Sequence, residues 1–186
     1  MHNLPIVDEA IVRALQLEAA KPGNDDKHTQ IFSLASSRAE NVEQFDPEML
    51  RAFFEMSKWC MYERNFRRAA MLMEKAWASI LSIFPDSRVK QLEALFVLKE
   101  SYVRLDEPNA AADALKAALA VMQDCIDRRD AYALTNLPQP PQKFAHTVLE
   151  FLRAAKHPQA LELKRKVAQL DQNWNLVRSA VEPAFD

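Results

Sequence analysis

The chain of 186 residues contains a single glycine, Gly23. Glycine is the usual residue of tight turns and left-handed backbone positions, so an architecture of sheets and short hairpins needs many of them. Ala, Leu, Glu, Lys, Arg and Met are plentiful instead, and these residues have the highest helix propensities. The sequence therefore predicts an all-α protein.

Prolines divide the chain into helices. Apolar residues recur at helical spacing, and the prolines fall between these periodic stretches, because proline is tolerated in the first turn of a helix but breaks its interior. The pattern predicts about eight helices, at residues 7–20, 28–43, 47–62, 66–83, 88–104, 108–129, 141–155 and 158–181. The predicted organisation is an N-terminal helix and linker at 1–26, a helical-repeat domain at 27–182 and a tail at 183–186.

The charge and hydropathy of the sequence indicate which kinds of partner and which cellular location to expect. A net charge of -2 gives no broad electrostatic reason to expect nucleic acid as the partner. No window holds 18 uncharged apolar residues, and the first residues lack the basic start and apolar core of a signal peptide. Cys60 and Cys125 lie in apolar helical stretches, which is typical of buried thiols in a reducing compartment. We therefore expect a cytoplasmic protein with no membrane partner.

The helix pairs after residue 47 repeat one another. Ala69 aligns with Ala111, 42 positions later, and Ala111 aligns with Ala160, 49 positions later. The extra residues of the third copy lie in the proline-rich loop at 135–141. Alanines let the second helix of a pair approach the first closely, and large residues then fill the gaps. These residues are Ala69, Ala76, Ala111, Ala118 and Ala160, with Phe53, Leu95, Tyr102 and Phe151.

The clearest copy reads Leu95-x-x-Leu98-x-x-x-Tyr102 in its first helix and Ala111-x-x-x-Leu115-x-x-Ala118 in its second. Over residues 47–170 this pattern resembles the tetratricopeptide repeat (TPR) family. The resemblance implies antiparallel helical hairpins stacked as a short right-handed solenoid that binds another protein. Three features depart from the family: the shift of 42 exceeds the usual 34, the turn glycine is missing, and a small residue is replaced by Lys99 and Val148 at the position that Ser57 fills. A generic stack of helical hairpins is the alternative.

In TPR-like stacks the first helix of each pair lines the concave face. The resemblance therefore implies a partner-binding surface made of Phe54, Lys58, Tyr62, Phe96, Glu100, Arg104 and Arg153. Aromatic rings offer rigid contact area, and cations can fix the orientation of a partner's carboxylates. Alternatively, Phe54 and Phe96 are covered by a neighbouring hairpin and belong to the core.

The sequence contains few of the motifs that catalytic sites require. It contains no HExxH or CxxC motif, and one glycine cannot build a phosphate-binding loop. His146 and Glu150 lie one helical turn apart, which predicts a helix-surface pair rather than a metal site. Arg153-x-x-x-His157 is superficially similar to the motif of HEPN-type ribonucleases, but the interval is shorter and a proline follows. His157 is better explained as the cap of the next helix, so we expect no enzyme, cofactor or metal.

The sequence thus favours a protein-interaction scaffold, an adaptor or chaperone, that holds a segment of a partner protein. A structural subunit that binds other copies of itself or a different protein is the alternative. A small helical ribonuclease is a distant third hypothesis.

Overall fold

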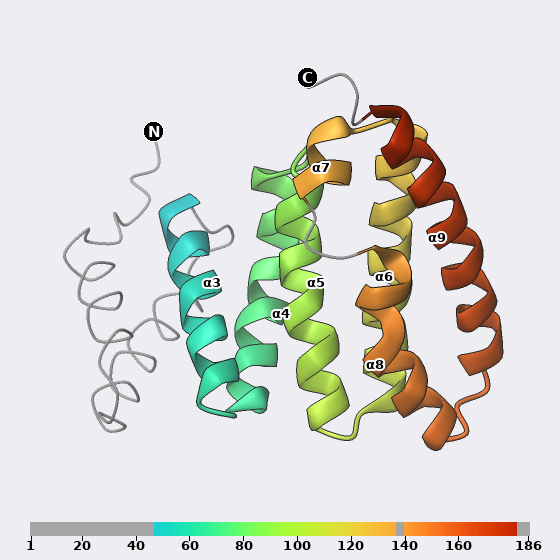
Figure 1. Cartoon of the computed structure of the whole chain (residues 1–186). Coiled ribbons are helices and arrows are strands. Elements are labelled where there is room, and N and C mark those ends of the chain that lie inside the picture. Colours follow the sequence, from blue (N-terminus) through green and yellow to red (C-terminus); the bar gives the residue numbers. More distant parts are fainter. Residues whose placement is uncertain (1–46, 137–139, 182–186) are drawn as a thin grey trace. The chain divides into compact units, whose positions relative to one another are not determined.

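The computed structural model describes residues 47–136 and 140–181 (Figure 1). Within these ranges every regular element is an α-helix and no strand occurs, which confirms the all-α prediction. The helices predicted at 7–20 and 28–43, and the tail at 183–186, lie outside the described residues. The chain divides between Ile83 and Phe84 into two units, and each is described by itself below.

The first unit contains the hairpin of α3 (Pro47–Tyr62) and α4 (Phe66–Ile83), whose bounds agree with the prediction. The two helices pack along each other. Ala69, Met73 and Ala76 of α4 are completely buried, and so is almost all of Phe53 on α3. The alanines therefore belong to the core of this unit, which agrees with the close helix packing that the repeat pattern predicts.

The second unit contains α5 (Arg88–Arg104), α6 (Pro108–Asp127), α7 (Ala131–Asn136), α8 (Pro141–Ala154) and α9 (Ala160–Val181). Helices α5 and α6 form one hairpin, and α8 and α9 form another. Helix α8 packs against both α5 and α6, and α9 packs against α6 (Figure 1). The core of this unit includes Leu95, Ala111, Leu115, Ala118, Val148 and Trp174. Ala160, expected at a close helix contact, is only half-buried.

Three helix boundaries differ from the prediction, and one of them is the end of α8 at Ala154 rather than at residue 155. The helix expected to reach residue 129 ends at Asp127, and the short helix α7 follows within a stretch expected to be irregular. Asp130 begins α7, because its Oδ1 accepts a hydrogen bond from the backbone N of Ala133 at 3.0 Å. Helix α9 begins at Ala160 rather than at residue 158. Local capping thus decides where these helices start.

In the part of the chain that the structure describes, four helices end in the same turn, and each turn places a residue other than glycine in the left-handed region. In α5 the backbone N of Glu107 donates to the carbonyl of Tyr102 at 2.9 Å, and the N of Asp106 donates to the carbonyl of Val103 at 3.4 Å. This pattern is a Schellman motif, which normally ends in glycine. The left-handed residues are Arg64 (φ 59°), Asp106 (φ 59°), Arg129 (φ 50°) and Lys156 (φ 53°). These helix ends therefore keep the turn geometry that glycine usually provides, although another residue occupies the left-handed position.

Lys156→Gly is expected to raise the free energy of unfolding by about 0.5–1 kcal/mol, because glycine removes the strain of a left-handed Cβ but makes the unfolded chain more flexible. Urea unfolding measures the change. Lys156→Val is the control, and we expect it to lower stability because a β-branched side chain fits this region poorly. A loss of stability in Lys156→Gly would contradict the assignment of this turn.

Candidate functional site

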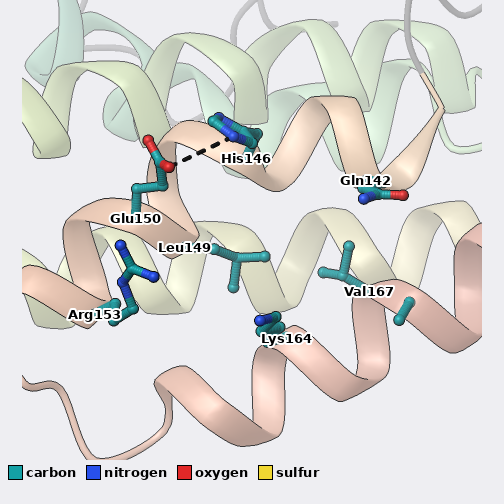
Figure 2. Close-up of a pocket in the computed structure, with 8 residues that line it drawn as sticks. Gln142, His146, Leu149, Glu150, Arg153, Lys164 and Val167 are labelled. Atoms are coloured by element: carbon teal, nitrogen blue, oxygen red, sulfur yellow. Dashed lines mark ion pairs between the residues drawn. The ribbon is translucent and has the colours of Figure 1, made fainter.

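A groove runs between α8 and α9, and Figure 2 shows the side chains that line it. Its volume is about 220 Å³. The lining residues are Gln142, His146, Leu149, Glu150, Arg153, Lys164, Val167 and Ala168. Val167 is buried and Leu149 is half-buried, and both lie in the space between the two helices (Figure 2). The groove therefore has an apolar floor with polar and charged groups around it.

The two cations of the groove come from different helices. Arg153 lies near the end of α8, Lys164 lies in the second turn of α9, and both side chains are exposed. Neither forms an ion pair with any residue in the described part of the chain. Unpaired cations beside apolar side chains can receive an anionic group from another molecule.

The acidic groups near the groove lie close to other polar groups. Glu150 Oε1 lies 3.6 Å from His146 Nε2, which is the pair that the sequence predicted on the surface of α8 (Figure 2). Asp171 of α9 accepts a hydrogen bond from the backbone N of Gln142, at the start of α8, at 3.1 Å. That contact satisfies one of the free N–H groups at the helix N-terminus. The groove thus keeps a positive end at Arg153 and Lys164.

Sequence reasoning identified Arg153 but missed Lys164. In the sequence Lys164 stands in a run with Arg165 and Lys166, a pattern that is typical of a solvated helix face. The structure separates these neighbours: Lys164 lines the α8–α9 groove, Arg165 does not line it, and Lys166 pairs with Glu162 at 2.8 Å. A usable signal was present, because residues at similar distances before and after a hairpin turn lie side by side on antiparallel helices.

The three predicted site residues of the first unit lie on α3 and differ in exposure. Phe54 is 4% exposed, which agrees with the alternative that it belongs to the core. Lys58 is exposed, and Tyr62, at the end of the helix, is 81% exposed. Phe54 therefore offers no accessible contact area in the form described, whereas Lys58 and Tyr62 remain surface residues.

The three predicted site residues on α5 contact other side chains of the second unit. Phe96 is 42% exposed, and its ring meets that of Phe144 on α8 edge-on, with centroids 6.2 Å apart. Arg104 Nε donates to Glu100 Oε1 at 3.2 Å, as an (i, i+4) pair. Phe96 is therefore partly a packing residue, and Glu100 and Arg104 partly satisfy each other.

Lys99 occupies the position at which the repeat family has a small residue, and it is buried, with 3% exposure. Its Nζ lies 4.6 Å from the ring centroid of Phe96 and 4.7 Å from that of Phe144. Burial lowers the pKa of this lysine, and the nearby carboxylate of Glu100 opposes the shift. The ammonium is thus held by two aromatic rings, and no ion pair with a described residue is found for it.

A second groove, of about 330 Å³, lies between α6 and α9. Leu119, Leu163 and Leu170 contribute to its lining. Its cations are already engaged: Lys116 pairs with Asp113 at 3.1 Å, and Lys166 pairs with Glu162 at 2.8 Å. This groove therefore offers apolar surface but little unsatisfied charge.

The nucleophilic candidates are poorly placed for chemistry. Burial raises the pKa of the Cys60 thiol to about 11 and that of Cys125 to about 12, so both stay protonated at neutral pH. His157 Nδ1 accepts from the backbone N of Gln159 at 3.3 Å, and its Nε2 lies 3.1 Å from Asn109 Oδ1. Both ring nitrogens thus hold the turn before α9, which is close to the predicted capping role.

Two further observations concern the described residues. Among them, no group of three or more His, Cys, Asp or Glu side chains could hold a metal ion. None of the helices in the described ranges combines the length and the apolar character needed to cross a membrane.

Comparison of the chain with family models, with curated proteins and with solved structures found no match. The resemblance to the tetratricopeptide repeat family therefore depends on the residues of this chain alone.

Proposed function

We propose that this chain is a protein-interaction scaffold, an adaptor or chaperone, that holds a segment of a partner protein in the α8–α9 groove. The helical hairpins supply a rigid framework, which we propose to be a short right-handed stack of the tetratricopeptide kind. The observation that carries the proposal is that Arg153 and Lys164 line one groove with an apolar floor from two helices, without an ion-pair partner among the described residues.

The composition of the groove supports recognition of a polypeptide. Binding surfaces on proteins combine an apolar centre with a few polar groups that fix the orientation of the partner. Here Leu149, Val167 and Ala168 supply the apolar centre, and Arg153 and Lys164 supply the polar groups. Charges at the edge of an interface chiefly set specificity and the rate of association.

The size of the groove argues against a small-molecule site. Pockets for small molecules usually measure about 300–1,000 Å³ and enclose most of the ligand. The α8–α9 groove, at about 220 Å³, is smaller and lies between two surface helices. It can receive a few side chains of a longer chain while the rest of that chain stays outside.

A structural subunit is the second candidate, because α9 carries large apolar side chains in solvent. Leu161 is 61% exposed and Leu176 is 72% exposed. Exposed apolar residues on α9 are compatible with a permanent contact to another copy or another subunit. The ribonuclease hypothesis is not favoured, because His157 already uses both ring nitrogens in contacts with Gln159 and Asn109.

Photo-crosslinking in the native cell lysate tests the proposed function. A photoreactive benzoylphenylalanine at Ala168 would lie in the groove, whereas the same residue at Gln172 would lie on the exposed surface of α9 outside it. We expect a discrete protein adduct from Ala168 that is absent or much weaker from Gln172. An excess of the unmodified chain should compete for it.

Two outcomes would redirect the proposal. Equal adduct patterns at Ala168 and Gln172 would show that the groove does not select a partner. An adduct to a second copy of this chain, together with a concentration-dependent dimer in sedimentation, would favour the structural subunit.

A further inference from the structure

We infer that the segment held in the α8–α9 groove is acidic and extended, with a carboxylate at Arg153 and Lys164 and an apolar side chain on Leu149 and Val167. This inference depends on the proposed function, namely that the groove binds a protein segment, and it specifies the chemistry of that segment.

The sign of the charge comes from the groove itself. Arg153 and Lys164 have no ion-pair partner among the described residues, whereas Glu150 is placed against His146 and Asp171 caps the start of α8. A basic segment would meet two unpaired cations and a single exposed carboxylate, that of Glu150. An acidic segment would meet a guanidinium that can bind a carboxylate through two parallel hydrogen bonds, and an ammonium beside it.

The spacing of the groove residues sets the spacing in the ligand. Leu149 precedes Arg153 by one turn on α8, and Ala168 follows Lys164 by one turn on α9, so the apolar and charged positions lie about 5–6 Å apart along each helix. In an extended chain, residues i and i+2 are about 6.6 Å apart and point to the same side. The matching ligand pattern is therefore an acidic residue, any residue, and then a large apolar residue, in either direction along the chain.

The α8–α9 groove has room for side chains rather than for a whole segment. It holds about 220 Å³, and an extended segment places every second side chain on the same side of its backbone. Alternate side chains of such a segment can enter the groove while the backbone remains above it.

The α6–α9 groove does not carry the same inference. It is larger, but the lysines on it already pair with Asp113 and Glu162. Nothing about that groove selects one kind of partner over another. The unsatisfied charge thus singles out the α8–α9 groove.

Fluorescence anisotropy with synthetic peptides tests the inference. The probes are ten-residue peptides that share two leucines and carry, two residues before each leucine, either Glu, Gln, Lys or phosphoserine. We expect the Glu peptide to bind about tenfold more tightly than the Gln peptide, as two exposed ion pairs would give, and the Lys peptide to bind most weakly. The preference should fall at 1 M salt because exposed charges are screened.

The matched variants change the same charges on the same two helices. Arg153→Glu with Lys164→Glu should abolish the preference for Glu and favour the Lys peptide. Lys143→Glu with Arg165→Glu reverses two exposed cations of α8 and α9 outside the groove, and it should keep the preference. An equal loss in both double variants would show that overall charge, not the groove, selects the peptide, and would overturn the inference.

The remaining outcomes separate the inference from the proposed function. Equal binding of the Glu and Gln peptides, with competition against the adduct formed at Ala168, would overturn the acidic ligand but leave the groove as a binding site. Tighter binding of the phosphoserine peptide, or of a single-stranded RNA, would overturn the carboxylate assignment. Failure of every peptide to bind at millimolar concentration would overturn both.

Discussion

Replacing Asp124 with alanine is expected to lower the free energy of unfolding by about 2–3 kcal/mol, because it leaves the guanidinium of Arg88 buried without its main partner. The Arg88 side chain is 8% exposed and lies at the start of α5. Its Nε donates to Asp124 Oδ2, near the end of α6, at 2.6 Å. The pair therefore joins the two ends of the α5–α6 hairpin. Urea unfolding followed by circular dichroism measures the change.

The expected loss is smaller than that for a completely buried pair, which is about 3–5 kcal/mol. The Asp124 side chain is 36% exposed, and Arg88 keeps contacts with Asp86 Oδ1 at 3.4 Å and with the carbonyl of Pro85 at 3.0 Å. Arg128→Ala is the control. Arg128 also binds Asp124, at 2.7 Å, but its side chain is 59% exposed, so its removal should cost less than about 1 kcal/mol. Similar losses in the two variants would contradict the role of Arg88.

The same pair predicts a dependence on pH. The hydrogen bond from Arg88 holds the pKa of Asp124 below its ordinary value; partial burial opposes this shift and Arg128 adds to it. A carboxyl group whose folded pKa is lowered contributes stability above its unfolded pKa, and that contribution is lost as the pH falls through the folded pKa. The difference between the natural chain and Asp124→Ala should therefore be constant from pH 5 to 8. It should shrink below about pH 4, the ordinary range for aspartate.

Replacing Lys99 with methionine is expected to raise the free energy of unfolding by about 1–3 kcal/mol at pH 7. The ammonium lies against the rings of Phe96 and Phe144, and burial costs several kcal/mol per ion. Each contact between the ammonium and an aromatic ring offsets about 0.5–2 kcal/mol of this cost. Methionine keeps the unbranched stem and packs well against aromatic rings without carrying a charge. Denaturant unfolding of both chains measures the difference.

The gain in stability from Lys99→Met should depend on pH in a defined direction. Burial lowers the folded pKa of Lys99 below 10.5, its ordinary value. Below the folded pKa both states carry the proton, and the full penalty of burying the charge applies. Between the folded pKa and 10.5 the unfolded chain binds more protons, so the stability of the natural chain rises with pH. The advantage of Lys99→Met should therefore shrink as the pH approaches 10.

Lys116→Met is the matched control, because Lys116 is on α6 in an exposed pair with Asp113. We expect it to change stability by less than about 0.5 kcal/mol. A loss of stability in Lys99→Met would show that the two aromatic contacts outweigh the cost of burial. The buried lysine would then be a stabilising feature of the α5–α8 contact.

Much of the helical structure could be predicted because its signals are local. Pro108 and Pro141 open α6 and α8, and Ser87 caps α5 by accepting from the backbone N of Lys90. Such residues act within one turn of the helix that they begin, so the sequence alone shows them. Helix α7 was missed because its six residues are too few for a periodic pattern, and only the cap at Asp130 indicates it.

The candidate site was predictable only in part, because exposure depends on residues far away in the sequence. Phe54 and Phe96 are equivalent in the repeat, yet they are 4% and 42% exposed. From the sequence of α5 alone, Lys99 would be expected to be an exposed cation, but Phe144, on α8, helps to bury it. Equivalent positions in a repeat share a helix face and need not share the same neighbours.

For the described residues, the sequence by itself determined that the protein is helical, where most helices begin and end, and which alanines of the first two hairpins belong to the core. These properties arise from backbone preferences and from the apolar stripe of each helix, which act over a few residues. Only the tertiary structure decided that Arg153 and Lys164 share a groove, that Arg88 is tied to Asp124, and that Lys99 is enclosed by rings. Each of these depends on side chains from two helices, or on how neighbouring helices cover a residue, and packing alone brings them together.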